Sequence, residues 1–179
     1  MDEQELEYLD AFAGYLRTLA SDVAEVAHVA PRSGNSEARA TLLGSLNYLF
    51  RSIDLIPDGI DDLGFLDDAF VLRIASRRAL IHDAKLGESN VGRFASEALL
   101  VDKFLGDLAY RFEHFLESKL AEHNVRGRTA RALSEDSAAS EEFVREVMAW
   151  TRTYTVPGFT RVPRNLIKLR SFLATRLPD

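Results

Sequence analysis

Apolar residues recur at alternating intervals of three and four along two long stretches of this sequence, and this spacing constrains the fold more than any other feature. Between residues 3 and 30 the stripe comprises Leu6, Leu9, Ala13, Leu16, Ala20, Val23 and Ala27. Between residues 91 and 123 it comprises Phe94, Ala98, Val101, Leu105, Leu108, Phe112 and Phe115. Such spacing places the side chains on one face of an α-helix. We therefore predict two long amphipathic helices that pair antiparallel to each other.

Shorter stretches with the same periodicity predict further helices at about residues 36–52, 66–85, 141–153 and 163–177. Glycine and proline separate them: Pro31 and Gly34 follow the first long stripe, and Pro157 precedes the last helix. We find no run that is typical of a β-strand. The sequence therefore predicts an all-α fold, a helical bundle of five to seven helices.

A length of 179 residues suits one domain, and the 46% hydrophobic and 28% charged content excludes wholesale disorder. We expect residues 1–130 to form the helical bundle. Residues 131–179 are expected to form a C-terminal helical extension that is basic at its end and packs on the same domain. The chain has no cysteine, which excludes disulfides, thiolate zinc sites and cysteine nucleophiles.

Residues 54–68 combine apolar side chains with six carboxylates and contain no basic residue. The carboxylates are those of Asp54, Asp58, Asp61, Asp62, Asp67 and Asp68. Because Pro57, Gly59 and Gly64 interrupt this segment, it cannot form one continuous helix. We expect a tight connection with a fixed local shape between two helices.

Three interpretations of these carboxylates are open. They can cap turns and helix ends, since Asp67 and Asp68 fall in the first turn of the predicted helix from residue 66, where the helix dipole favours anions. They can bind Mg²⁺ or Ca²⁺, which take several carboxylate and carbonyl oxygens, although the spacing is not that of an EF-hand. They can also form a docking surface for a basic partner.

Two stretches in this region resemble the YkvA-like family, domain of unknown function 1232, over about residues 42–75. They are Tyr-Leu-Phe-Arg-Ser-Ile-Asp-Leu-Ile-Pro-Asp at 48–58 and Leu-Gly-Phe-Leu-Asp-Asp at 63–68. The resemblance implies a helix–turn–helix hairpin that carries the acidic motif. It implies a framework of Tyr48, Ile53, Pro57, Gly64 and Phe65, and four motif carboxylates: Asp54, Asp58, Asp67 and Asp68. The family has no established reaction, so the resemblance implies no mechanism.

The charge of this chain is unevenly distributed. The formal net charge is −6, but residues 1–10 contribute −5 and residues 151–179 contribute +5. The basic end carries Arg161, Arg164, Lys168 and Arg170 beside regularly spaced leucines. A basic amphipathic helix can lie on anionic lipid or an acidic partner, or it can pack its apolar side on the bundle and leave its cations in water. The overall negative charge argues against a nucleic-acid partner.

We expect a non-enzymatic protein-interaction or scaffolding module, with a protein partner or self-association, and with peripheral contact to an anionic membrane through the basic face. We expect no cofactor and identify no small-molecule substrate. A cytoplasmic location is predicted, because the acidic N-terminus resembles no signal peptide and no apolar run reaches the length of a membrane span. The alternative is a divalent-metal-dependent hydrolase that uses Asp54, Asp58, Asp67 and Asp68 as ligands, with Asp58 or Asp68 activating a metal-bound water.

Overall fold

The computed structural model describes residues 1–51, 55–56 and 63–179, and within these ranges the chain forms eight α-helices and no β-strand. The helices are α1 (Glu3–Val29), α2 (Ser36–Tyr48), α3 (Leu66–His82), α4 (Asn90–Leu105), α5 (Leu108–Lys119), α6 (Ala130–Glu135), α7 (Ser137–Thr153) and α8 (Pro163–Arg176), with two short 3₁₀ helices, η1 (Ala30–Arg32) and η2 (Ala84–Glu88). The all-α prediction is confirmed, with one helix more than the upper limit of the expected range.

The first two helices begin where side chains satisfy their free backbone N–H groups. Asp2 precedes α1 and accepts a hydrogen bond from the Glu5 N–H at 2.7 Å, while the Glu5 side chain accepts from the Asp2 N–H at 2.9 Å. This reciprocal pair is a capping box. Asn35 caps α2 by accepting from the Ala38 N–H at 3.0 Å. Local sequence therefore determines both starting points.

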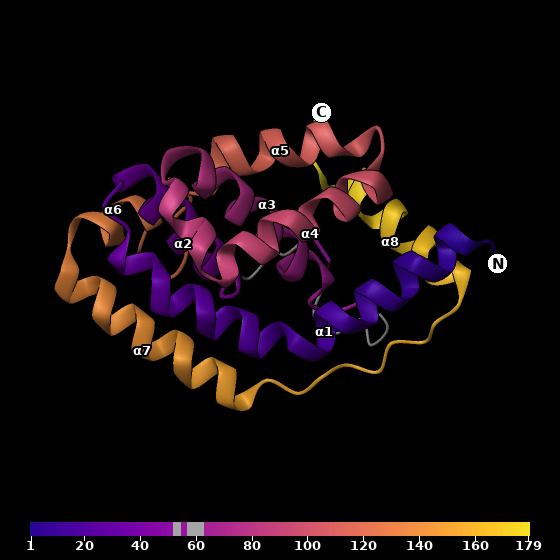
Figure 1. Ribbon diagram of the computed structural model, residues 1–179, viewed down its shortest axis with the longest axis horizontal. Helices are drawn as coiled ribbons and strands as arrows, with labels where there is room; N and C mark the ends of the chain where they lie inside the picture. Colours follow the sequence, from indigo (N-terminus) through magenta and orange to yellow (C-terminus); the bar gives the residue numbers. More distant parts are fainter. Residues whose placement is uncertain (52–54, 57–62) are drawn as a thin grey trace.

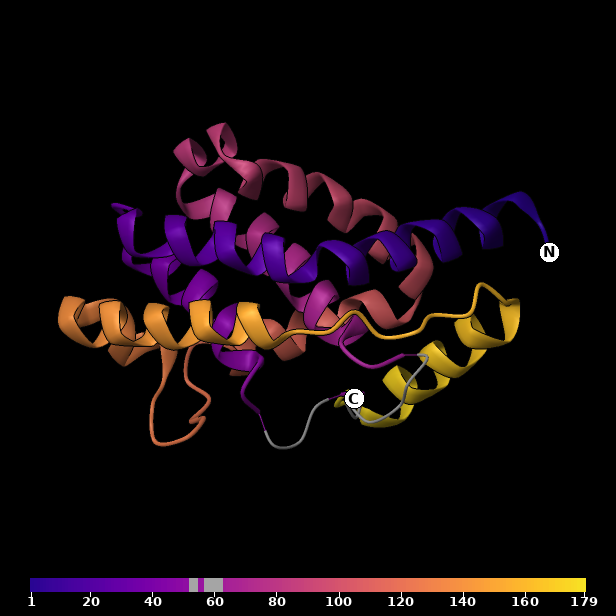
Figure 2. The ribbon, with the colours of Figure 1, turned by 90° about the horizontal axis from the view of Figure 1, so that it is seen from below.

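Helices α1, α2 and α4 pack around α3, whose residues 66–76 are all buried in the main apolar core. The stripe residues Leu16 in α1 and Val101 in α4 are both fully buried. The ring centroids of Tyr8 and Phe104 are 5.3 Å apart at one end of the α1–α4 pair. Both views show α1 and α4 running in opposite directions (Figures 1 and 2), which confirms the antiparallel pair. Because these stripes line the core of the chain itself, contact with a second copy would have to use other surfaces.

The single helix predicted over residues 91–123 is wrong, because the chain breaks it at Gly106. Helix α4 ends at Leu105, Gly106 adopts a positive φ of 56°, and α5 begins at Leu108. Glycine adopts such a backbone conformation at little cost and is common directly after a helix. Leu105 and Leu108 are both buried on either side of the break. The apolar stripe therefore continues while the helix does not.

A second difference lies between residues 130 and 153, where the structure has two helices instead of one that begins near residue 141. Thr129 caps α6 by accepting from the Ala132 N–H at 3.1 Å. Asp136 caps α7 in the same way, accepting from the Ala139 N–H at 3.1 Å. The polar residues of this stretch therefore cap helices or lie within them, with Ser134 and Ser140 buried, and the stretch is not a loop.

Helices α7 and α8 add apolar residues to the same core: Phe143 and Val147 from α7, and Leu169 and Leu173 from α8, are all buried. Figures 1 and 2 show the extended connection that follows α7 running along the molecule to α8. At its start, Tyr154 donates a hydrogen bond from its hydroxyl to the Leu16 carbonyl of α1 at 2.7 Å. The division into residues 1–130 and 131–179 stays a prediction. None of the described helices is long and apolar enough to cross a membrane.

Candidate functional site

The buried hydroxyl of Tyr48 joins the end of α2 to the start of α3. It donates a hydrogen bond to Oδ2 of Asp67 at 2.6 Å and accepts one from the Leu55 N–H at 3.0 Å. The same Asp67 oxygen accepts from the Ile56 N–H at 3.2 Å. Tyr48 and Asp67 are 2% and 0% exposed, so these bonds form away from water, where an unmade hydrogen bond is costly. The Tyr48 hydroxyl and the Asp67 carboxylate thus hold residues 55 and 56 against both helices.

Phe65 lies directly before α3 in the left-handed conformation, with φ of 69°. This conformation is rare for a bulky residue and costs free energy that the surrounding contacts must supply. The Phe65 ring meets Trp150 and Tyr154 edge-on, with centroid separations of 6.1 and 5.3 Å. Aromatic contacts with the end of α7 therefore stabilise the turn that starts α3.

Asp67 and Asp68 lie in the first turn of α3 as predicted, and both are buried, at 0% and 3% exposure. Burial, followed by the charges of these two carboxylates, raises the pKa of Tyr48 well above its ordinary value. Burial and the charge of Asp68 also raise the pKa of Tyr154. Both phenols therefore stay protonated at neutral pH, and the Tyr48 hydroxyl stays a donor to Asp67.

Part of the predicted motif lies outside the described residues, namely Ile53, Asp54, Pro57 and Asp58. Convergence of the four motif carboxylates on one point therefore stays a prediction. Within residues 1–51, 55–56 and 63–179, no group of three or more acidic or histidine side chains is placed to hold a metal ion. Of the predicted framework, Tyr48 is the last residue of α2, and Gly64 and Phe65 directly precede α3.

The arrangement around Tyr48 and Asp67 falls within a recognisable stretch of sequence. Residues 38–74 match the family model described as a protein of unknown function (DUF1232). The match is partial, and it agrees with the resemblance seen in the sequence. The searches of curated proteins and of solved structures found no match. We refer to residues 38–74 as the DUF1232 segment; it comprises most of α2, the connection and the first half of α3.

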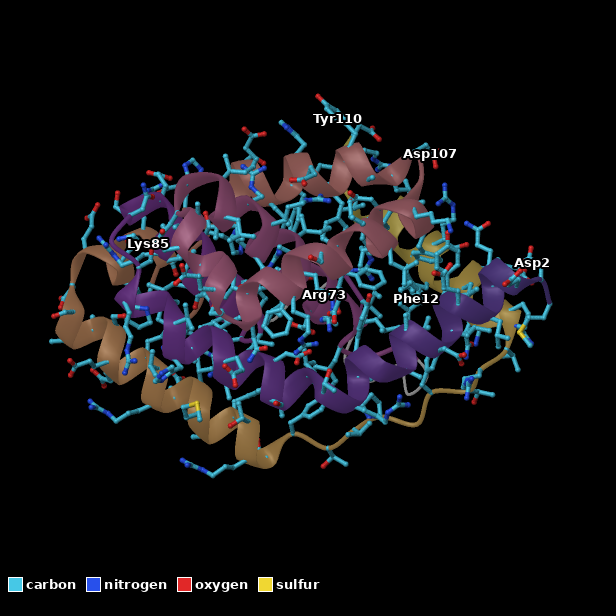
Figure 3. All side chains as sticks on the ribbon, viewed as in Figure 1. Asp2, Phe12, Arg73, Lys85, Asp107 and Tyr110 are labelled. Atoms are coloured by element: carbon cyan, nitrogen blue, oxygen red, sulfur yellow. The ribbon has the colours of Figure 1, made fainter. Side chains whose placement is uncertain are left out.

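Near its end, the DUF1232 segment contains a buried arginine that the sequence reasoning missed. Arg73 is fully buried and pairs with Asp22 of α1 at 3.0 Å and with Glu97 of α4 at 2.8 Å. Its guanidinium lies 3.6 Å from the centre of the Tyr15 ring and donates to the Ala69 carbonyl at 3.1 Å. Figure 3 shows Arg73 in the middle of the molecule. The available signal was one arginine inside the apolar run from Phe70 to Ala75.

The four cations of the predicted basic face do not share one environment. Arg161, which precedes α8, pairs with Asp10 of α1. Arg170 pairs with Asp107 and donates to the Phe104 and Leu105 carbonyls, so it caps the C-terminus of α4. Arg164 and Lys168 line a hollow on the outer side of α8. Intramolecular contacts therefore occupy two of the four cations, and the other two lie on one outer face.

Proposed function

We propose that this protein acts by binding and not by catalysis, as an interaction or scaffolding module in which the DUF1232 segment is the rigid structural element. The observation that carries this proposal is that Asp67 forms hydrogen bonds within the protein core. Its carboxylate accepts hydrogen bonds from Tyr48 and from the backbone of Ile56 inside the core. A carboxylate with such bonds positions chain segments, because hydrogen bonds to a buried charged group contribute strongly to stability.

The rest of the DUF1232 segment supports the same proposal. Arg73 joins α3 to α1 and α4 through Asp22 and Glu97. Through Tyr48, Asp67 and Arg73, the segment therefore joins α2, α3, α1 and α4 by buried polar contacts. A rigid arrangement of this kind presents fixed outer surfaces, and these are what an interaction module offers to a partner. The cytoplasm as its location stays part of the proposal.

A metal-dependent hydrolase is the second candidate, and one observation favours it. Asp67 and Asp68 are neighbouring carboxylates that are both buried, and functional carboxylates are often held in such surroundings. Bound Mg²⁺, Mn²⁺ or Ca²⁺ would also need ligands from Asp54 and Asp58. Asp58 or Asp68 would then activate a metal-bound water.

Thermal unfolding with and without each of these three metal ions separates the two candidates. We expect the melting temperature of the wild-type protein to be the same with and without metal, and Asp67→Asn to lower it in both conditions. Glu142→Gln, on the exposed surface of α7, is the control and should change nothing. A metal-dependent rise in the wild-type melting temperature that Asp67→Asn and Asp68→Asn abolish would contradict the binding-module proposal and support the hydrolase.

A further inference from the structure

The outward side of α8 forms a basic and apolar surface, which we call the α8 outer face. It borders a hollow of about 480 Å³, and its largest side chains are Arg164, Ile167, Lys168, Phe172 and Arg176. A serine and a threonine are the remaining described residues that line the hollow. Ile167 is 68% exposed, so an accessible apolar side chain lies among these cations.

This face points away from the bundle because of the helical period. Leu166, Leu169 and Leu173 are buried and attach one side of α8 to the core. Residues 164, 168 and 175 lie about half a turn around the helix from these leucines. The α8 outer face is therefore the solvent-facing side of a helix whose opposite side is already packed.

The charges on the α8 outer face are all of one sign. Arg164, Lys168 and Arg176 are cationic, and no carboxylate occurs among the described residues that line the hollow. Two other arginines of this part of the chain are paired: Asp10 pairs with Arg161, and Asp107 pairs with Arg170. Asp10 and Asp107 are thus paired with arginines outside the hollow, while the described residues that line the hollow carry a net positive charge.

We propose that the α8 outer face lies on an anionic lipid membrane surface. This inference rests on the proposed function, since it names the partner of a binding module. The three cations extend over about 18 Å of helix, at 1.5 Å per residue. Such a spread matches an array of lipid headgroups better than one discrete anion. The exposed Ile167 lies among the cations, and an apolar side chain at this position on an interfacial helix enters the boundary between headgroups and acyl chains.

Vesicle co-sedimentation of the full chain tests the proposal, with vesicles of equimolar phosphatidylserine and phosphatidylcholine compared with pure phosphatidylcholine. We expect binding to the anionic vesicles alone, weakening as salt is added. The triple variant Arg164→Gln/Lys168→Gln/Arg176→Gln should lose roughly 100-fold in affinity, from about fivefold per cation near an anionic surface. Ile167→Ser should weaken binding without changing the charge.

The matched control is Arg17→Gln/Arg145→Gln/Arg152→Gln, which makes the same change in net charge at exposed positions of α1 and α7. It should bind nearly as well as the wild type. Equal losses in the two triple variants, or no binding of the wild type to anionic vesicles, would overturn the proposal. Wild-type binding to polyglutamate without binding to vesicles would also overturn it, in favour of an acidic protein partner. None of these outcomes depends on metal, so failure here is distinct from failure of the binding-module proposal.

Discussion

Arg73 and Arg131 make similar sets of contacts in very different surroundings. Arg73 pairs with Asp22 and Glu97, and its side chain is 1% exposed. Arg131 pairs with Glu37 at 2.6 Å and with Glu122 at 2.8 Å, and its side chain is 32% exposed. Each arginine thus joins its own helix to two other parts of the chain. Burial therefore decides how much such an ion pair contributes to the free energy of unfolding, because water competes for Arg131 and cannot reach Arg73.

The largest expected effect comes from removing the buried arginine. Arg73→Met keeps an apolar chain of similar length but leaves Asp22, which is 1% exposed, without its closest cation. Because Arg93 still pairs with Asp22 at 3.3 Å, we expect the free energy of unfolding to fall by about 3 kcal/mol, the lower end of the usual cost of removing one partner from a buried ion pair. Urea-induced unfolding followed by circular dichroism measures it.

The matched control for this experiment is Arg131→Met. Its expected cost is less than about 1 kcal/mol, because the exposed carboxylates that it leaves regain water. Similar losses in the free energy of unfolding of the two variants would show that burial does not set the contribution of these arginines.

An intermediate effect is expected for Tyr48→Phe. This variant removes the donor to Asp67 and the acceptor for the Leu55 N–H, at a cost of about 1–3 kcal/mol in the free energy of unfolding. Folding raises the pKa of Tyr48 above its ordinary 10.0. The unfolded chain therefore releases this proton first as pH rises, and the stabilisation is complete below pH 10 and declines above it.

The measurement is the free energy of unfolding of wild type and Tyr48→Phe between about pH 8 and about pH 11. The difference between them should narrow as pH rises through this range. Tyr15 and Tyr154, whose pKa values burial also raises, are present in both proteins and do not affect the difference. A difference that is constant with pH would show that Tyr48 ionises alike in the folded and unfolded states.

The smallest effect is expected for Glu37→Gln. The hydrogen bond from Arg131 lowers the pKa of Glu37 below its ordinary 4.5. The stabilisation is therefore present above that pH and is lost as pH falls through the lowered value. We expect Glu37→Gln to melt slightly below the wild type at neutral pH, corresponding to less than about 1 kcal/mol, and to match it in acid and in concentrated salt. A deficit that persists under both conditions would mean that Glu37 acts through packing.

The elements that the sequence predicts well are those with local signals. The helix predicted from residue 36 begins there as α2, although Asn35 is the residue that caps it, and Pro163 marks the start of α8. The break at Gly106 was missed because the apolar stripe passes through it without interruption. The start of α7 was placed too late because the polar stretch before residue 141 resembles a loop, whereas Asp136 in fact caps a helix.

In the candidate site too, the local features were predicted and the long-range contacts were not. Tyr48, Asp67 and Asp68 were identified from sequence, and Asp67 and Asp68 were expected in the first turn of α3. The actual acceptor role of Asp67, toward the Ile56 N–H and the Tyr48 hydroxyl, depends on a chain reversal between α2 and α3. Arg73 was missed altogether, since its partners are 51 and 24 residues away.

The helical class, the apolar side of each long helix and the cationic character of α8 follow from the amino-acid sequence, because helical period and side-chain charge are local properties. Which of the charged side chains are paired and which face solvent depends on how the helices pack together. Arg73, Arg161 and Arg170 found partners on other helices, while Arg164 and Lys168 lie on the outer face of α8. The physical reason is that the strength of a charge pair depends on its distance and its exposure to water, and both are set by packing between segments that are distant in the chain.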